Sequence, residues 1–235
     1  MANEQTSEDI KAEFIEGMGP DLGAIYYILY NDVVWSHIKW KQYKTLFGVS
    51  EARIALLNES ASSFFYVVER VFWENILLNL CRLTDSETTR RSRNQTHANL
   101  SLGYMANSIT EESLKDALNE IINRAVEATC FARVWRNKWL AHRDLDHSLK
   151  RAVDPLPPVS RLDIENALLS IREVMNFIHK HYLSKEVGFE YAVASGDADT
   201  LVYFLRVAQQ EIELKKDRLL RGEPLSSDFF EPPAS

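Results

Sequence analysis

Glycine and proline are scarce in this chain, with 8 and 7 among its 235 residues. They are concentrated between stretches of helical periodicity, which excludes an architecture of many short strands and tight turns. The pattern predicts an all-α bundle of about six helices. Because 46% of the residues are apolar or aromatic, the chain can bury a substantial core, and a disordered chain is excluded as well.

Cysteine is rarer still. Cys81 and Cys130 lie in helical apolar stretches without C-x-x-C spacing, which favours free buried thiols over a disulfide or a zinc site. No apolar run approaches the ~18 residues of a membrane span, and the first ten residues lack the layout of a signal peptide. The absence of a P-loop, a GxGxxG motif and a nucleophile elbow disfavours nucleotide hydrolases, dehydrogenases and serine hydrolases. We expect a cytoplasmic protein with no membrane partner, no metal and no cofactor.

An excess of positive charge is also lacking. Lysine and arginine number 27 against 34 acidic residues, for a net charge of −7. No global field would attract nucleic acid, so a polyanion would need a local basic patch. The segment 133–143 provides one, because it carries four cations and no acid: Arg133, Arg136, Lys138 and Arg143.

The chain divides into three parts. We expect a flexible acidic segment over residues 1–19, with a short helix at 6–19, then a single all-α domain over 20–221 and a flexible tail over 222–235. Asn58, Ser160 and the pattern from Ser108 to Glu111 have the residue types of helix N-terminal caps. A mobile polar loop is expected at 84–99. The domain's helices are expected at about 20–48, 58–83, 101–107, 111–141, 160–183 and 197–221.

Two polar features interrupt the apolar pattern. Asn75, Asn79 and Arg82 lie at i, i+4 and i+7, on one stripe of an otherwise apolar helix. This stripe should face solvent, a partner chain or a polar site, since buried amides and guanidinium groups need partners. The loop at 84–99 carries three further cations that could guide an RNA backbone: Arg90, Arg91 and Arg93.

The stretch "RNKWLAHRD", residues 136–144, has the residue types needed to cut RNA without a metal. Such cleavage requires a base for the ribose 2′-hydroxyl, an acid for the leaving oxygen and a cation for the phosphate charge. His142 can exchange protons near neutral pH, since histidine titrates near ~6.5. Arg136 stays charged and can hold a phosphate through two donors.

The spacing of these two residues limits the geometry. On one continuous α-helix they would lie roughly 120° apart and about 9 Å apart along the axis. Either the helix distorts or ends near residue 141, or a second protomer completes the site across a two-fold axis. An alternative needs no catalysis: a histidine and arginines in the last turn of a helix are favoured by the free carbonyls and the helix dipole.

The motifs resemble a known family. "RNKWLAHRD" is similar to the arginine–histidine signature of the HEPN superfamily. Together with "LFGVSEARIALLN" and "ENILLNLCRLTD", it resembles the abortive-infection type U branch over about residues 40 to 185. The resemblance implies an all-α bundle that forms a two-fold homodimer, in which the two motifs meet in a cleft that often acts as a metal-independent endoribonuclease.

The resemblance also implies roles for residues. Arg136 would bind the phosphate, Asn137 would orient Arg136 or the histidine, and His142 would be the general acid or base. Arg82 and Asp85 match the "RLTD" element, which with Asn75 and Asn79 would support the site or contact the second protomer.

Two functions of different classes follow. The first is a metal-independent endoribonuclease of toxin or antiviral-defence type, with RNA as substrate and a cognate antitoxin or regulator as a further partner. The alternative is a non-catalytic dimeric module that binds a nucleotide, an RNA or a protein. A third interpretation treats the motif only as a helix end.

Overall fold

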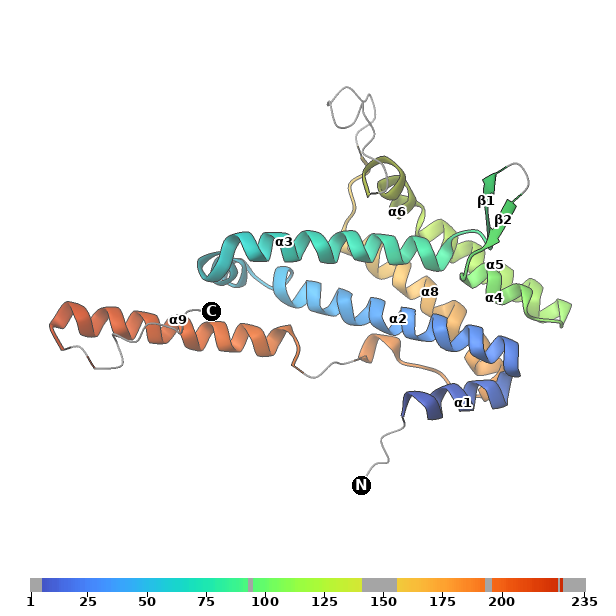
Figure 1. Ribbon diagram of the computed structural model, residues 1–235, viewed down its shortest axis with the longest axis horizontal. Coiled ribbons are helices and arrows are strands. Elements are labelled where there is room, and N and C mark those ends of the chain that lie inside the picture. The colour runs from blue at the N-terminus through green and yellow to red at the C-terminus, as the bar shows by residue number, and fades with distance from the viewer. Residues whose placement is uncertain (1–5, 93–94, 141–155, 193–195, 224, 226–235) are drawn as a thin grey trace. The chain divides into compact units, whose positions relative to one another are not determined.

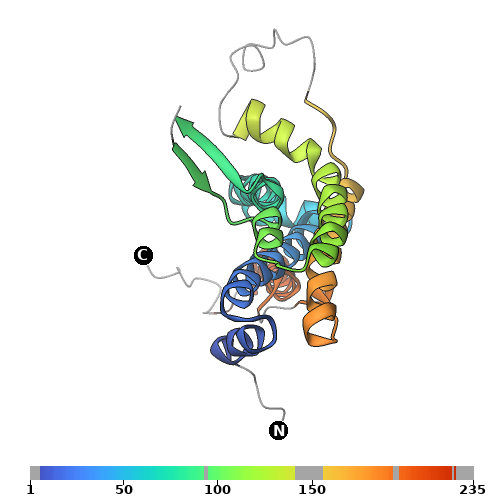
Figure 2. The same cartoon turned by 90° about the vertical axis from the view of Figure 1, so that its right-hand side faces the viewer.

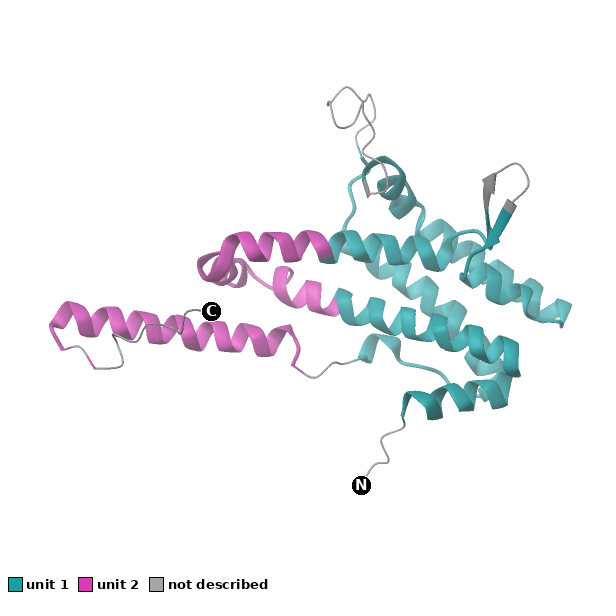
Figure 3. Cartoon of the chain, in the orientation of Figure 1, with its two compact units in different colours: residues 1–40, 72–192 teal, residues 41–71, 193–235 magenta. Residues whose placement is uncertain are grey.

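The computed structural model describes residues 6–92, 95–140, 156–192, 196–223 and 225 (Figure 1). These residues are predominantly helical and form eight α-helices, which confirms the all-α prediction. They divide into two compact units, residues 1–40 with 72–192 and residues 41–71 with 193–235 (Figure 3). The span 20–221 predicted as one domain includes parts of both. No helix in the described ranges is long and apolar enough to cross a membrane.

The first unit is built around helices that pack through apolar faces. α5 and α8 make the most extensive helix pairing and lie side by side in both Figure 1 and Figure 2. Thr6 and Ser160 form capping boxes with Asp9 and Asp163, so the predicted starts of α1 and α8 are confirmed. The helices that contribute to this unit are α1 (Ser7–Met18), α2 (Pro20–Phe47), α3 (Glu51–Thr84), α4 (Leu102–Asn107), α5 (Glu112–Ala128), α6 (Cys130–Trp135) and α8 (Arg161–Leu183).

Two predicted helix starts are wrong. α3 begins at Glu51 because Ser50 accepts a hydrogen bond from the Arg53 amide (3.2 Å), so Asn58 is not a cap, and the helix instead has a non-helical residue at Ala61. α5 has Glu111 at its N-cap without a side-chain hydrogen bond, because Ser108 ends α4, where its amide donates to the Met105 carbonyl (3.0 Å). Asn58 therefore lies inside α3, and Ser108 ends the preceding helix instead of starting the next one.

The polar segment predicted as a mobile loop contains a β-hairpin instead. Strands β1 (Thr88–Ser92) and β2 (Gln95–Ala98) pair antiparallel, with Thr88 opposite Ala98 (Figure 2). Threonine is β-branched and suits a strand. The Asn99 side chain secures the base of the hairpin by donating to the Ser86 carbonyl (2.8 Å) and to Thr89 Oγ1 (2.6 Å).

The cysteines differ from each other. Cys81 is fully buried as expected, and burial raises the pKa of its thiol to about 11. Cys130 is exposed, so the prediction of a buried thiol is wrong there. It is the first residue of α6, after the break at Thr129 that separates this helix from α5.

His179 is a structural histidine of the first unit. Its Nδ1 lies 3.1 Å from the Tyr26 hydroxyl, and its ring packs edge-on to Phe14 at 5.6 Å between centroids. Burial lowers the pKa of His179 below its ordinary value of 6.5, Glu13 opposes this shift, and Lys185 adds to it. The ring is therefore neutral at neutral pH in the folded chain.

This burial predicts a loss of stability in acid. Below pH 6.5 the unfolded chain takes up the His179 proton while the folded chain does not, so the stability from the neutral ring is complete above pH 6.5 and is lost as the pH falls toward the folded pKa. We expect the Tm to fall between about pH 7.5 and about pH 5.5. His179→Gln should lower the Tm at neutral pH but flatten this dependence, whereas exposed His181→Ala should leave it unchanged. Equal slopes for wild type and His179→Gln would refute the assignment.

The second unit contains α9 (Ala198–Arg221), close to the predicted bounds of 197–221. Gly222 ends it as expected, and Asp197, which was not singled out, caps its start. Its first turn is held by Gln42, whose side chain accepts from the Ala198 amide (2.6 Å), and by an ion pair between Arg53 and Asp199 (3.0 Å). About three turns further along the helix, Gln209 donates to Glu59.

Candidate functional site

An arginine and an aspartate from distant parts of the first unit form the centre of the candidate site. Asp85 follows the last residue of α3, and Arg136 is the first residue of a π-helix, η1 (Arg136–Leu140). Arg136 Nη1 donates to both carboxylate oxygens of Asp85, at 2.8 and 2.6 Å. The two side chains are 26% and 28% exposed, so the pair is shielded yet reachable from solvent.

The pair holds Arg136 in one orientation. The hydrogen bond to Asp85 raises the pKa of Arg136 against the opposing effect of burial. Both bonds to Asp85 use Nη1, and Nε donates to Asn137 Oδ1 (3.2 Å). The contact with Asp85 therefore occupies one arm of the guanidinium fork, which is the group that recognises phosphate through parallel donors.

Arg133, one turn before Arg136, has a different set of partners. It donates to the Thr84 carbonyl and hydroxyl (2.5 and 2.7 Å), to the Val126 carbonyl (3.0 Å) and to Thr129 Oγ1 (3.1 Å). Its Nε also lies 3.8 Å from Asp85. These bonds join the end of α3 to the break between α5 and α6. We call Thr84, Asp85, Arg133 and Arg136 the arginine cluster.

The contacts of Arg133 predict a role in stability, although the sequence had suggested an RNA contact. Arg133→Ala would leave the Thr84 and Val126 carbonyls without this donor, and bonds to charged groups of this kind contribute about 1.5–3 kcal/mol. We expect a loss of about 2–3 kcal/mol in the free energy of unfolding, measured by urea titration. Exposed Arg124→Ala is the matched control and should change little. An Arg133→Ala protein of full stability and weakened RNA binding would restore the RNA-contact role.

The helix that carries the motif is distorted, one of the two solutions that the spacing allowed. The long helix expected over 111–141 breaks at Thr129 (φ −103°, ψ 4°), and Arg136, Asn137 and Lys138 lie on π-wound backbone. Single π-helical turns are uncommon and are found disproportionately at functional sites. Trp135 fixes the start of this turn, because its indole donates to the Pro157 carbonyl (2.9 Å) in the connector before α8.

The remaining predicted residues fall into three groups. Asn137 is exposed and Lys138 is half-buried, both beside Arg136 on η1. Arg90 and Arg91 belong to β1. Arg93, His142 and Arg143 lie outside the described residues.

The "RLTD" element serves two separate connections. Arg82 pairs with Asp32 of α2 at 2.7 Å and is 62% exposed. Thr84 and Asp85, by contrast, belong to the arginine cluster, where they bind Arg133 and Arg136. On the same stripe as Arg82, Asn79 donates to Asn75 Oδ1 (3.3 Å). Sequence patterns did not identify Thr84, Thr129 or Asp32 as partners. For Thr84 the one available signal was its position inside the RLTD element.

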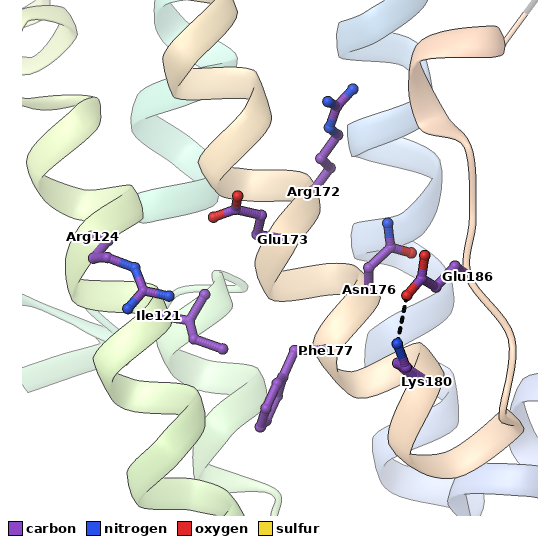
Figure 4. Close-up of a pocket in the computed structure, with 8 residues that line it drawn as sticks. All are labelled: Ile121, Arg124, Arg172, Glu173, Asn176, Phe177, Lys180 and Glu186. Atoms are coloured by element: carbon purple, nitrogen blue, oxygen red, sulfur yellow. Dashed lines mark hydrogen bonds and ion pairs between the residues drawn. The ribbon is translucent and has the colours of Figure 1, made fainter.

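A concavity separate from the arginine cluster lies between α5 and α8 (Figure 4), with a volume of about 400 Å³. Two of its cations are already paired, Lys180 with Glu186 (2.8 Å) and Arg172 with Glu190 (3.1 Å). Asn176 accepts from the Val187 amide (2.8 Å) and donates to its carbonyl (3.0 Å). These bonds hold the segment after α8 against that helix. The lining residues are Ile121, Arg124, Arg172, Glu173, Asn176, Phe177, Lys180 and Glu186.

In the described ranges, no three histidine, cysteine or acidic side chains come together in a way that could hold a metal ion.

The sequence model of the HEPN family described as AbiU2 matches residues 19–204, which is more than half of the chain and includes the whole arginine cluster. No curated protein and no solved structure matches the chain.

Proposed function

We infer the function from one premise: the chain belongs to the AbiU2 family of HEPN proteins. On this basis we propose that it is a metal-independent endoribonuclease of abortive-infection type. Arg136 binds the scissile phosphate, Asn137 orients Arg136, and His142 exchanges the proton of the ribose 2′-hydroxyl or of the leaving oxygen.

The observation that carries this proposal is the Asp85–Arg136 pair at the start of η1. A guanidinium that acts on a phosphate has to be charged and held in one place before the substrate arrives. Arginine is charged at any ordinary pH, and Asp85 holds it in place, while the side chain of Arg136 remains 26% exposed. A purely structural arginine would show the pattern of Arg133, whose bonds go to protein groups on several sides.

Each step of the proposed reaction uses a residue of this chain. A base removes the 2′-hydroxyl proton, the resulting oxygen attacks the adjacent phosphorus, and the bond to the 5′-oxygen of the next nucleotide breaks. The leaving oxygen receives a proton, and the product ends in a 2′,3′-cyclic phosphate. Arg136 offsets the charge that builds on the phosphate. A second protomer would supply a second His142, one for each proton transfer.

A second function is favoured by a specific observation. Asp85 lies close to the guanidinium that would face RNA, and its negative charge opposes the approach of a polyanion. The net charge of −7 acts in the same direction. Both oppose a long RNA strand more than a small ligand or a protein, and so suit a dimeric module that binds a nucleotide or a protein without cutting RNA.

Incubation with labelled tRNA and mRNA in excess EDTA tests the first function against the second. The ribonuclease proposal predicts cleavage that EDTA does not stop. Intact RNA together with saturable nucleotide or RNA binding, lost in Arg136→Ala, would support the binding module instead. Cleavage only after added Mg²⁺ would contradict both.

A further inference from the structure

α2 and α3 present a strip of polar and aromatic side chains on the surface of the first unit. On α2, the spacing of Asp32, Trp35 and Lys39 places them within about 60° of one another around the helix. On α3, Asn75 and Arg82 are seven residues apart and share a face in the same way. We call these five residues, all of which belong to the first unit, the α2–α3 strip: Asp32, Trp35, Lys39, Asn75 and Arg82.

Electrostatic contacts join the two halves of the strip. Arg82 Nη2 donates to Asp32 (2.7 Å), which ties the α3 half to the α2 half. Burial lowers the pKa of Lys39, the positive charge of Arg82 lowers it further, and Asp32 opposes both effects. Lys39 therefore lies within electrostatic reach of Arg82. Two neighbouring cations repel each other, and an anion bound between them would relieve that repulsion.

Arg82 is held in the same manner as Arg136. Each guanidinium binds its carboxylate through a single nitrogen, Arg82 through Nη2 and Arg136 through Nη1. The side chain of Arg82 is 62% exposed. The rest of its guanidinium can therefore bind a phosphate while Asp32 fixes its position.

Trp35 provides an aromatic face beside these cations. The chain has five tryptophans, all of them within the described residues, and Trp35 is the only exposed one, at 54%. Aromatic side chains next to cations bind unpaired bases by stacking. Asn79 donates to Asn75 Oδ1 (3.3 Å), which leaves the NH2 group of Asn75 to donate to a ligand. An aromatic face, an amide and two cations are the groups that bind a single-stranded nucleotide.

The strip adjoins the arginine cluster through α3. Arg82 pairs with α2, and Asp85, three residues later, pairs with Arg136 of η1. Figure 1 shows α3 between α2 and α6, the helix that precedes η1. Arg82 and Asp85 are about one helical turn apart, so a strand with a phosphate at Arg136 can continue onto the strip.

We propose that the α2–α3 strip binds single-stranded RNA beside the scissile phosphate, with an unpaired base stacked on Trp35 and phosphates at Arg82 and Lys39. This inference rests on the proposed ribonuclease function and adds the class of RNA that the site takes. Base-paired RNA offers Trp35 no free base face, so a duplex should bind more weakly than a single strand.

The fluorescence anisotropy of a labelled oligoribonucleotide tests the proposal, with the full chain carrying His142→Ala so that the RNA stays intact. Trp35→Ala should weaken binding of the single strand by about 5–100-fold, the usual contribution of one stacked base, and Trp35→Phe should retain most of the affinity. Arg82→Ala should reduce the slope of log K against log salt by about 0.7, as for one lost phosphate contact. A duplex of the same sequence provides the comparison.

Two variants outside the strip are matched controls. Tyr191 is a 78% exposed aromatic residue, and Lys185 is an exposed cation that pairs with Glu13 of α1 (2.7 Å). Tyr191→Ala and Lys185→Ala should both keep the wild-type affinity. Because Trp35 and Arg82 are more than half exposed, their variants should keep the wild-type circular dichroism spectrum.

Unchanged affinity in a folded Trp35→Ala protein would overturn the proposal and assign the strip to a protein partner, since exposed tryptophan and arginine are also common at protein interfaces. Equal binding of the single strand and the duplex would overturn it too. Cutting by the chain with His142 intact tests the ribonuclease function separately. RNA that is cut, with unchanged affinity in Trp35→Ala, refutes the strip alone, whereas Trp35-dependent binding without cutting refutes the ribonuclease function alone.

Discussion

Replacement of His142 by alanine is expected to lower the rate of RNA cleavage by about 10²–10⁴-fold, the usual contribution of one proton-transfer group. The imidazole is the one side chain of the motif that can accept and donate a proton near neutral pH. Because the expected loss is chemical, kcat should fall while the apparent affinity for RNA changes little. The measurement is single-turnover cleavage of a labelled RNA.

His181→Ala provides the control for this variant. His181 is exposed on α8 and has no place in the proposed reaction, so its loss should leave the rate within about twofold of wild type. Full activity in a folded His142→Ala protein would remove His142 from the mechanism.

Replacement of Arg136 by alanine is expected to have an effect of similar size, about 10²–10³-fold in kcat, as for the loss of one group that stabilises a transition-state charge. Arg136→Lys should recover little of the activity. An ammonium is a compact point charge and cannot hold Asp85 and a phosphate with separate arms, as a guanidinium does. Exposed Arg124→Ala, in the same unit, should retain the wild-type rate.

Asp85→Asn separates the two effects of the carboxylate. Its loss should loosen Arg136 and lower kcat, and it should also remove a negative charge and so lower KM for RNA. A fall in kcat together with a fall in KM is the signature of a residue that positions Arg136 and also repels RNA. A fall in stability with no change in either constant would show that the Asp85–Arg136 pair only holds the fold together.

Some helix boundaries were predictable from local signals, although the local signals at Asn58 and Ser108 failed. Thr6, Ser160 and Gly222 cap helices as their residue types indicate, because a cap depends on a few neighbouring backbone groups. The hairpin of β1 and β2 was missed because its polar, threonine-containing sequence also suits a loop. The segment forms a hairpin because its two strands pair with each other and Asn99 bonds to Thr89 at the base.

The site was predictable in its residue types but not in its connections. Arg136 and Asp85 were both singled out, yet the sequence could not show that they bind each other across 51 positions. Arg133 looked equivalent to Arg136, and only the fold places Thr84 and Thr129 around it. The π-helix at Arg136 follows a break at Thr129, and the apolar spacing through both is that of an ordinary α-helix.

The most direct test of the central claim is the chemistry of the RNA ends left by the wild-type protein in excess EDTA, with His142→Ala and Arg136→Ala alongside. Transfer to the ribose 2′-oxygen predicts fragments with 2′,3′-cyclic phosphate and 5′-hydroxyl ends, absent with both variants. Fragments with 3′-hydroxyl and 5′-phosphate ends, or cyclic phosphate ends formed equally by the variants, would contradict it.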